Sequence, residues 1–61
     1  MELSALVNTK IEIVPVSGPD LFAWLRGVEA SGIWIERRME NDEERTSFWP
    51  FPAIREIIPL K

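Results

Sequence analysis

The chain has 61 residues and a formal net charge of −3, an acidic balance that argues against non-specific nucleic-acid binding, which needs a surplus of Lys and Arg. It contains no Cys and no His, so disulfides and the common zinc sites are excluded. A single domain of this size buries only about 60% of the surface exposed in its unfolded form, which leaves self-association as the available source of extra stability.

The first nine residues differ in pattern from the rest of the chain. Leu3, Leu6 and Val7 have helical spacing, which predicts a short helix or an irregular arm over residues 1–9. This segment has no basic start followed by an apolar stretch, and no apolar run approaches the roughly 20 residues that a membrane span needs. We therefore expect a cytoplasmic protein with no membrane partner.

Residues 10–16 alternate between apolar and polar side chains, as a half-buried strand requires. Ile11 and Ile13 share one face of this predicted strand, opposite charged neighbours. Pro15 has no N–H to donate to a sheet, so it predicts a free edge or a β-bulge. Residues 17–20 are a turn signal, because their Gly accepts unusual backbone angles and their Pro fixes one.

The next predicted strand, residues 21–28, is apolar on both faces for most of its length. Its two faces carry Leu21, Ala23 and Leu25 on one side and Phe22, Trp24 and Arg26 on the other. A sheet packed on one side only would not need this pattern, so we expect burial of both faces. Gly27 predicts a bend of the kind that curls a small sheet into a barrel. The tight turn at residues 29–32 ends in Gly32, where a left-handed residue commonly completes a hairpin.

The rest of the chain continues as short strands. We expect further strands at residues 33–38, 46–51 and 55–60, a solvated loop at 39–45 and one helical turn at 52–54. Pro50 again indicates an edge position or the end of a strand. Five short strands with close-set turns favour an all-β barrel over a sandwich, with residues 10–61 as its single domain.

The sequence gives little support to catalysis. A serine nucleophile needs an activating base, and the chain has neither His nor Cys. The carboxylates of the 39–45 loop are solvated, whereas a catalytic carboxylate needs an enclosing pocket that raises its pKa. Ligand spacing for a metal, a Gly-rich phosphate loop and a dinucleotide fingerprint are all missing. We therefore predict no catalytic residue, no metal site and no cofactor.

The large aromatic side chains are the remaining candidates for function. Trp24, Trp34 and Trp49, with Phe22 and Phe51, allow two interpretations. They can form a surface that stacks nucleic-acid bases or holds a proline-rich peptide. They can instead fill a small core and a subunit contact, which is the commoner use of large rings in a short chain.

The predicted hairpin carries a recognisable order of residues. Ala23, Leu25, Gly27, Val28 and Glu29 precede its turn, and Ile33, Trp34 and Ile35 follow it. From about residue 6 to residue 60, this order resembles the Sm-like (LSm) family. Residues 53–59 are similar to the closing segment of the bacterial RNA chaperone Hfq, and the 39–45 loop falls at the family's most variable loop. The resemblance implies a five-stranded, strongly bent SH3-like (Sm-like) barrel preceded by a short N-terminal helix.

The resemblance also implies a mode of assembly. In the Sm-like family the fourth strand of one subunit pairs with the fifth strand of the next, which generates closed rings. An open barrel with exposed edges must cover them or aggregate, and a head-to-tail contact that closes gives a ring. We therefore expect a homo-oligomeric ring. Its candidate interface residues are Phe48, Trp49, Phe51, Ile57, Ile58 and Leu60.

Single-stranded RNA is the ligand class that the resemblance suggests first. The candidate ligand or RNA contacts are Arg26, Glu29, Trp34, Arg37 and Arg38. RNA-binding members of the family carry base-reading side chains where this chain has Gly32 and Ile33, and again where it has residues 50–52. Together with the acidic net charge, this difference keeps an alternative open. In that alternative the protein is an interaction adaptor or scaffold that holds another protein and does not bind nucleic acid.

Overall fold

The computed structural model describes residues 3–60, which form an all-β fold with two short 3-10 helices. In chain order the elements are η1 (Leu3–Leu6), β1 (Lys10–Pro15), β2 (Leu21–Glu29), β3 (Gly32–Arg38), β4 (Glu44–Pro50), η2 (Phe51–Ala53) and β5 (Ile54–Pro59). The predicted strands and the helical turn are all present, with boundaries within two residues of those expected. The short N-terminal helical turn is also confirmed.

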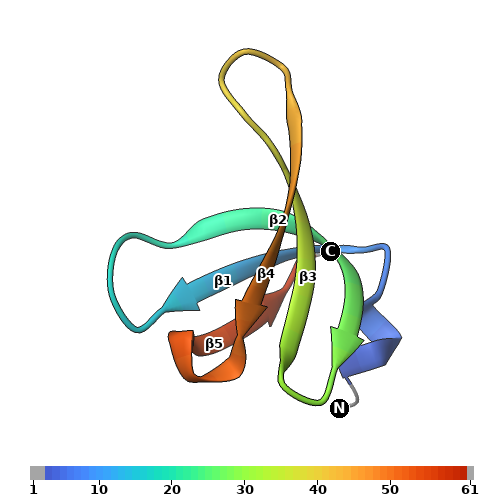
Figure 1. Ribbon diagram of the computed structural model, residues 1–61, viewed down its shortest axis with the longest axis vertical. Helices are drawn as coiled ribbons and strands as arrows, with labels where there is room; N and C mark the ends of the chain where they lie inside the picture. Colours follow the sequence, from blue (N-terminus) through green and yellow to red (C-terminus); the bar gives the residue numbers. More distant parts are fainter. Residues whose placement is uncertain (1–2, 61) are drawn as a thin grey trace.

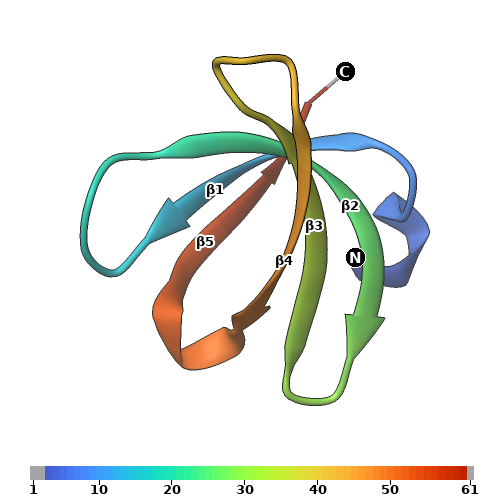
Figure 2. The same cartoon turned by 45° about the horizontal axis from the view of Figure 1, so that its top comes forward.

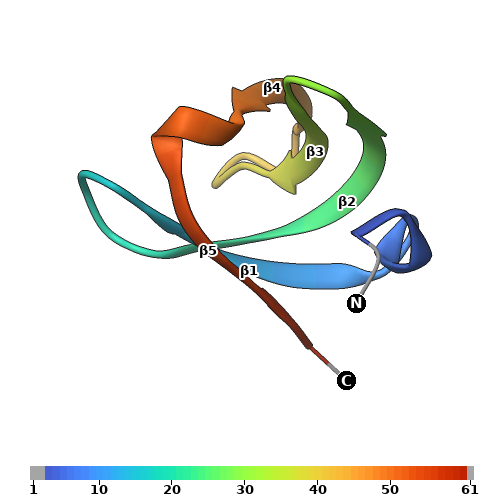
Figure 3. The same ribbon diagram turned by 90° about the horizontal axis from the view of Figure 1, so that it is seen from below.

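The five strands form one antiparallel sheet in the order β4-β3-β2-β1-β5 (Figure 1). The sheet is strongly bent, because β2 curves from its pairing with β1 to its pairing with β3 (Figure 3). η2 joins the end of β4 to the start of β5, but these two strands do not pair with each other (Figure 2). The sheet is therefore not closed into a barrel within one chain, and β4 and β5 are its two open edges.

The core is made of aliphatic side chains that β1, β2 and β3 direct to the inner face of the bent sheet. They are Ile11, Ile13, Ala23, Leu25, Ile33 and Ile35, each at most 2% exposed. Their spacing by two along each strand is the alternation that the sequence predicted. Leu3 and Leu6 of η1 pack against this core. The Asn8 N–H that follows η1 donates to the Leu25 carbonyl at 2.6 Å, which fixes the N-terminal segment on β2.

Two irregularities bend the sheet where the sequence predicted them. The β2–β3 register shifts between Leu25 and Gly27, so that Arg26 is an extra residue without a partner on β3. The β1–β5 register shifts between Val14 and Pro15, where Arg55 of β5 is the extra residue, so a bulge lies opposite this step as the proline predicted. Each extra residue increases the local twist and turns the strand away from its neighbour.

The outer face of β2 departs from the prediction that both faces of this strand are buried. Phe22 is 56% exposed and Trp24 is 43% exposed. The physical reason is that the chain forms one layer of sheet, and a single layer covers only the face on which its strands converge. Within residues 3–60 the fully buried core holds no aromatic ring, and of the rings considered only Trp49 packs against its edge. The rings therefore do not fill the core, and their use in a subunit contact stays a prediction.

Gly32 also behaves differently from the prediction of a left-handed turn residue. Positive φ angles occur at Asn8, Gly18 and Asp42 within residues 3–60, and not at Gly32. Gly32 is instead the buried first residue of β3, paired with Pro50 of β4. A Cβ atom there would overlap the Trp49 carbonyl oxygen and lie 2.8 Å from the Pro50 Cα. Glycine is required at this position because the backbone of the neighbouring β4 approaches too closely for a Cβ atom.

The Gly32→Ala variant should therefore lower the free energy of unfolding by about 2 kcal/mol, a typical cost of overpacking, because the nearest atom in its way and one of the next two belong to the β4 backbone. Gly27→Ala is the matched control. Its Cβ would lie 3.6 Å from the nearest Trp34 atom, an ordinary contact. Urea unfolding followed by circular dichroism, at one protein concentration for all samples, measures both effects. Equal losses in the two variants would contradict this account of Gly32.

Candidate functional site

A fork in the sheet, where β2 and β3 separate, is the most distinctive feature outside the core. Pairing between these strands extends only as far as Trp24 opposite Glu36. Before that point β2 pairs with β1, with Phe22 opposite Glu12. Beyond it β3 pairs with β4, with Arg37 opposite Arg45. The β3–β4 hairpin then projects away from the rest of the molecule (Figure 1).

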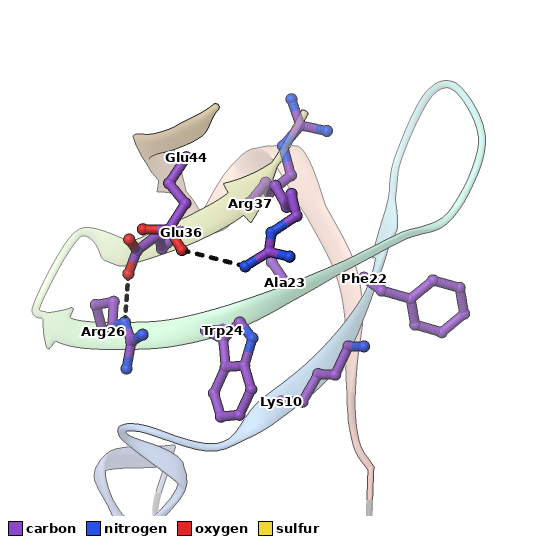
Figure 4. A pocket seen from close by; sticks show the side chains of 9 residues that line it. Lys10, Phe22, Ala23, Trp24, Arg26, Glu36, Arg37 and Glu44 are labelled. Atoms are coloured by element: carbon purple, nitrogen blue, oxygen red, sulfur yellow. Dashed lines mark hydrogen bonds and ion pairs between the residues drawn. The ribbon is translucent and has the colours of Figure 1, made fainter. Parts of the chain in front are cut away.

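A pocket of about 430 Å³ occupies this fork, and we call it the fork pocket. Its lining residues are Lys10, Phe22, Ala23, Trp24, Arg26, Glu36, Arg37, Arg38 and Glu44 (Figure 4). The volume falls in the range of about 300–1,000 Å³ that is typical of small-molecule sites. Four paired strands supply the lining, so the sheet fixes the backbone positions from which these side chains project.

Positive charge is concentrated in the fork pocket. Its lining contains four of the seven Lys and Arg residues of the chain and only two carboxylates. Arg26 Nε donates to Glu36 Oε1 at 2.7 Å, and Arg26 Nη1 donates to Asn8 Oδ1 at 3.0 Å. The hydrogen bond from Arg26 lowers the pKa of Glu36, so this carboxylate stays ionised and remains paired with Arg26.

Two of the four cations have no carboxylate to balance them. Lys10 and Arg37 form no ion pair with any other described residue, and the Arg37 Nε is buried without a hydrogen-bond partner. Arg37 also lies directly opposite Arg45 on β4, an arrangement of like charges that destabilises a strand pair. Arg38 and Glu44 approach only to 3.7 Å and are both largely exposed. An anion in the pocket would therefore meet unpaired positive charge.

Two exposed rings, Phe22 and Trp24, lie on the outer face of β2. Trp24 lies between Arg26 on one side and Lys10 and Phe22 on the other (Figure 4). The Arg26 guanidinium carbon is 5.4 Å from the centre of the Trp24 ring, a cation–π contact. The fork pocket thus combines unpaired cations with accessible aromatic surface.

The predicted ligand contacts fall in two separate places. Arg26, Arg37 and Arg38 all line the fork pocket. Glu29 and Trp34 do not. They bond to each other farther along the outer face, where the Trp34 Nε1 donates to Glu29 Oε2 at 2.7 Å. The Trp34 ring also packs on Phe48 of β4, with ring centres 5.0 Å apart, and this contact fixes the indole on the sheet.

Lys10 is a pocket residue that sequence reasoning missed, and Trp24 was considered only as one ring among several. The alternation of β2 already placed Phe22, Trp24 and Arg26 on one face. The missing information was the register, which sets Lys10 opposite Trp24, and the point where β2 and β3 separate.

The candidate interface residues lie on the two open edges and on η2. Trp49 of β4 and Ile57 of β5 pack against the core of their own chain. Phe48 and Ile58 have the opposite orientation, since their cross-strand partners are the outward-facing Trp34 and Glu12. Leu60 follows β5 and is half-buried. Phe51 of η2 is 37% exposed.

An acidic group lies on the outer face of β1. The hydrogen bond between the Glu12 and Asp20 side chains raises the pKa of Glu12, and desolvation and the nearby negative charges of Asp20 and Glu56 act in the same direction. Among the described residues, no group of three or more acidic side chains has an arrangement that could hold a metal ion. None of the helices in residues 3–60 has the length and apolar character to cross a membrane.

Comparison of the chain with protein-family models, with curated proteins and with solved structures finds no match. Its function is therefore inferred from the residues and their arrangement.

Opposite pKa shifts predict opposite effects of two matched substitutions. Because the pKa of Glu12 is raised in the folded state, its ionised form costs stability near neutral pH, and Glu12→Gln should raise the free energy of unfolding there. Because the pKa of Glu36 is lowered, its ionised form contributes stability, and Glu36→Gln should reduce it. Both differences should shrink as the pH falls below about 4, where carboxylates protonate in the unfolded chain too.

Urea unfolding at a series of pH values measures both variants. Changes of the same sign near neutral pH would contradict the assignment of these two carboxylates to unlike environments.

Proposed function

We propose that this chain is a non-enzymatic subunit of the Sm-like type that assembles into a closed homo-oligomeric ring in the cytoplasm, with single-stranded RNA as its ligand class. The observation that carries the ring is the presence of two open edges, β4 and β5, on one bent sheet. An unpaired edge presents a row of backbone N–H and C=O groups that can pair with another chain. Pairing of β4 with β5 of a neighbour would satisfy both edges at once.

The geometry of such a contact favours a closed assembly. β4 and β5 are different surfaces, so their contact is head-to-tail and every subunit keeps one edge free for the next. A ring results when the rotation between subunits closes, and an open filament results when it does not. A ring leaves no free edge, which is the arrangement a soluble small β-protein needs.

Side chains at the two edges support the same contact. Phe48, Ile58 and Leu60 are only half-buried in the isolated chain, and Phe51 of η2, between the two edge strands in sequence, is exposed. A subunit contact that covers this apolar surface would stabilise the assembly by about 25 cal/mol for each Å² removed from water. This gain would supplement the small core of a short chain.

The finer assignment to an SH3-like barrel of the Sm-like type rests on several features taken together. The short helix before β1, the five strands and the strong bend at Gly27 agree with the order of features that the sequence resemblance implies. The strand order β4-β3-β2-β1-β5 leaves free the two strands that pair between subunits in that family. Barrel closure is proposed to occur through neighbouring subunits.

An adaptor that holds another protein is the alternative function. The exposed Phe22 and Trp24 favour it, since aromatic rings on a rigid face are common anchors in protein interfaces. The net charge of −3 favours it as well. In this alternative the same ring can form, but its ligand is a peptide or a partner subunit.

The first prediction from the ring is the mass of the particle. In dilute buffer at micromolar concentration, the protein should sediment as a multiple of its 7.1 kDa chain. Analytical ultracentrifugation over a range of concentrations measures this mass. A clean monomer throughout would overturn the ring.

A single lysine on the β5 edge should dissociate the assembly. Ile58 faces outward on this edge strand, and natural proteins use edge lysines to prevent pairing between sheets. Ile58→Lys should therefore sediment as a monomer, and Ile58→Val, which keeps an apolar side chain, should remain assembled. Circular dichroism of both variants checks that the sheet persists. Retention of the full particle mass by folded Ile58→Lys would exclude β5 as the contact.

A further inference from the structure

Four side chains on the outer face of β1 and β2 form a patch with opposite charge at its two ends. In the β1–β2 ladder, Lys10 lies opposite Trp24 and Glu12 lies opposite Phe22. Residues directly opposite each other in an antiparallel pair project from the same face, and all four alternate with buried core residues. Figure 4 shows Lys10 between the two rings. We call these four residues the outer patch.

The outer patch occupies a regular and uncovered part of the sheet. Its register is continuous from Lys10 opposite Trp24 to Ile13 opposite Leu21, and the bulges next to β1 and β2 fall outside these residues. Phe22 and Trp24 are both exposed. Exposed aromatic rings grouped on a rigid sheet are typical anchors of protein interfaces.

The charges of the outer patch are not balanced within one chain. Lys10 has no ion-pair partner among residues 3–60, although Glu12 is only two residues away on the same strand. The Glu12 side chain shares a hydrogen bond with Asp20 and lies near Glu56, so three carboxylates gather at its end of the patch. A partner that carries the same two charges in the reverse order would balance both ends.

We propose that the outer patch binds the outer patch of a second copy of this chain, face to face and with the two β1 strands antiparallel. A two-fold axis in the plane of the contact, crossing β1 near Ile11 and β2 near its partner Ala23, produces this arrangement. The axis sets Lys10 of each copy over Glu12 of the other. One symmetric contact therefore balances the charges at both ends of both patches.

The rings meet in the same arrangement, with Phe22 of each copy over Trp24 of the other. Sheets that pack face to face lie about 10 Å apart, a gap that large side chains from both faces fill. A two-fold axis along the strands would instead set Glu12 over Phe22 and leave its carboxylate without a cation. The antiparallel arrangement is favoured because it pairs charge with charge and ring with ring.

The outer patch is separate from the edges that the ring would use. The ring contact joins β4 to β5, whereas the patch lies on β1 and β2, neither of which is an edge strand. Both contacts can therefore form in one particle. Ile58 is the neighbour of Glu12 on β5, so Ile58→Lys would put a cation beside Glu12 and weaken the face contact as well as the edge contact.

Reversal of charge tests the antiparallel arrangement. Lys10→Glu and Glu12→Lys should each raise the dissociation constant of the face contact at least tenfold, because each sets like charges over one another. A chain with both substitutions should recover association, since its two pairs are only reversed, and the two single variants should associate with each other when mixed. Analytical ultracentrifugation over a range of concentrations measures association, and circular dichroism checks that each variant is folded. Failure of recovery in the double variant or in the mixture would overturn the proposal.

Two further variants separate the outer patch from general effects of charge. Arg38→Glu makes the same change of charge as Lys10→Glu, but in the projecting hairpin, and should associate as the unchanged chain does. Trp24→Ala should weaken the contact without changing its dependence on salt, because it removes apolar area and no charge. Equal losses in Lys10→Glu and Arg38→Glu would contradict the assigned surface.

The contact should also depend on pH through Glu12. In one chain the hydrogen bond with Asp20 raises the pKa of Glu12, and desolvation and the negative charges of Asp20 and Glu56 act in the same direction. In the contact, Lys10 of the second copy would favour the ionised form and lower this pKa. Association should therefore weaken as the pH falls through the raised pKa of Glu12, and Glu12→Gln should remove most of this dependence. A contact that strengthens on acidification would contradict the proposal.

The particle mass keeps the face contact apart from the ring. If both form, Lys10→Glu should halve the mass of the unchanged particle. A ring whose mass is the same in the unchanged chain and in Lys10→Glu overturns only the face contact. A dimer that Lys10→Glu converts to a monomer overturns only the ring. A chain that stays monomeric at every concentration overturns both and leaves the outer patch to a different protein partner.

Discussion

Six aliphatic side chains on the inner face of β1, β2 and β3 hold this small protein together. They are nearly inaccessible to solvent because period-two alternation directs all of them to the side toward which the sheet bends. The same constraint leaves the outer face without a covering layer. Phe22, Trp24 and Trp34 are therefore exposed although they are among the largest apolar residues of the chain. Their exposure follows from the sheet having one layer.

The bend that encloses the core also creates the fork pocket. Arg26 is the extra residue of the β2–β3 pairing, and beyond Trp24 and Glu36 the two strands follow different partners. β2 continues along β1, while β3 and β4 extend as a separate hairpin. Cations from β1, β2 and β3 that are far apart in sequence then line one pocket. In a short chain, a single β-bulge can change the direction of several neighbouring strands.

Pairing between strands is incomplete in two parts of the sheet. The open edges of β4 and β5 lack a partner along their whole length, and the fork lacks one along part of β2 and β3. Backbone groups at an open edge favour another strand. At the fork, Lys10 and Arg37 have no ion-pair partner among residues 3–60. The edges therefore suit the proposed assembly.

The sequence by itself determined the strands and the side chains of the core, because alternation at Ile11, Ile13, Ile33 and Ile35 is a local property of the chain. It also indicated the bend at Gly27. Only the tertiary structure decided which residues meet at a site, since the register that sets Lys10 opposite Trp24 depends on pairing between segments distant in sequence. The need for glycine at position 32 likewise became clear only from its pairing with Pro50, which brings the β4 backbone too close for a Cβ atom. Local patterns specify elements, whereas the approach of separate strands specifies pockets and edges.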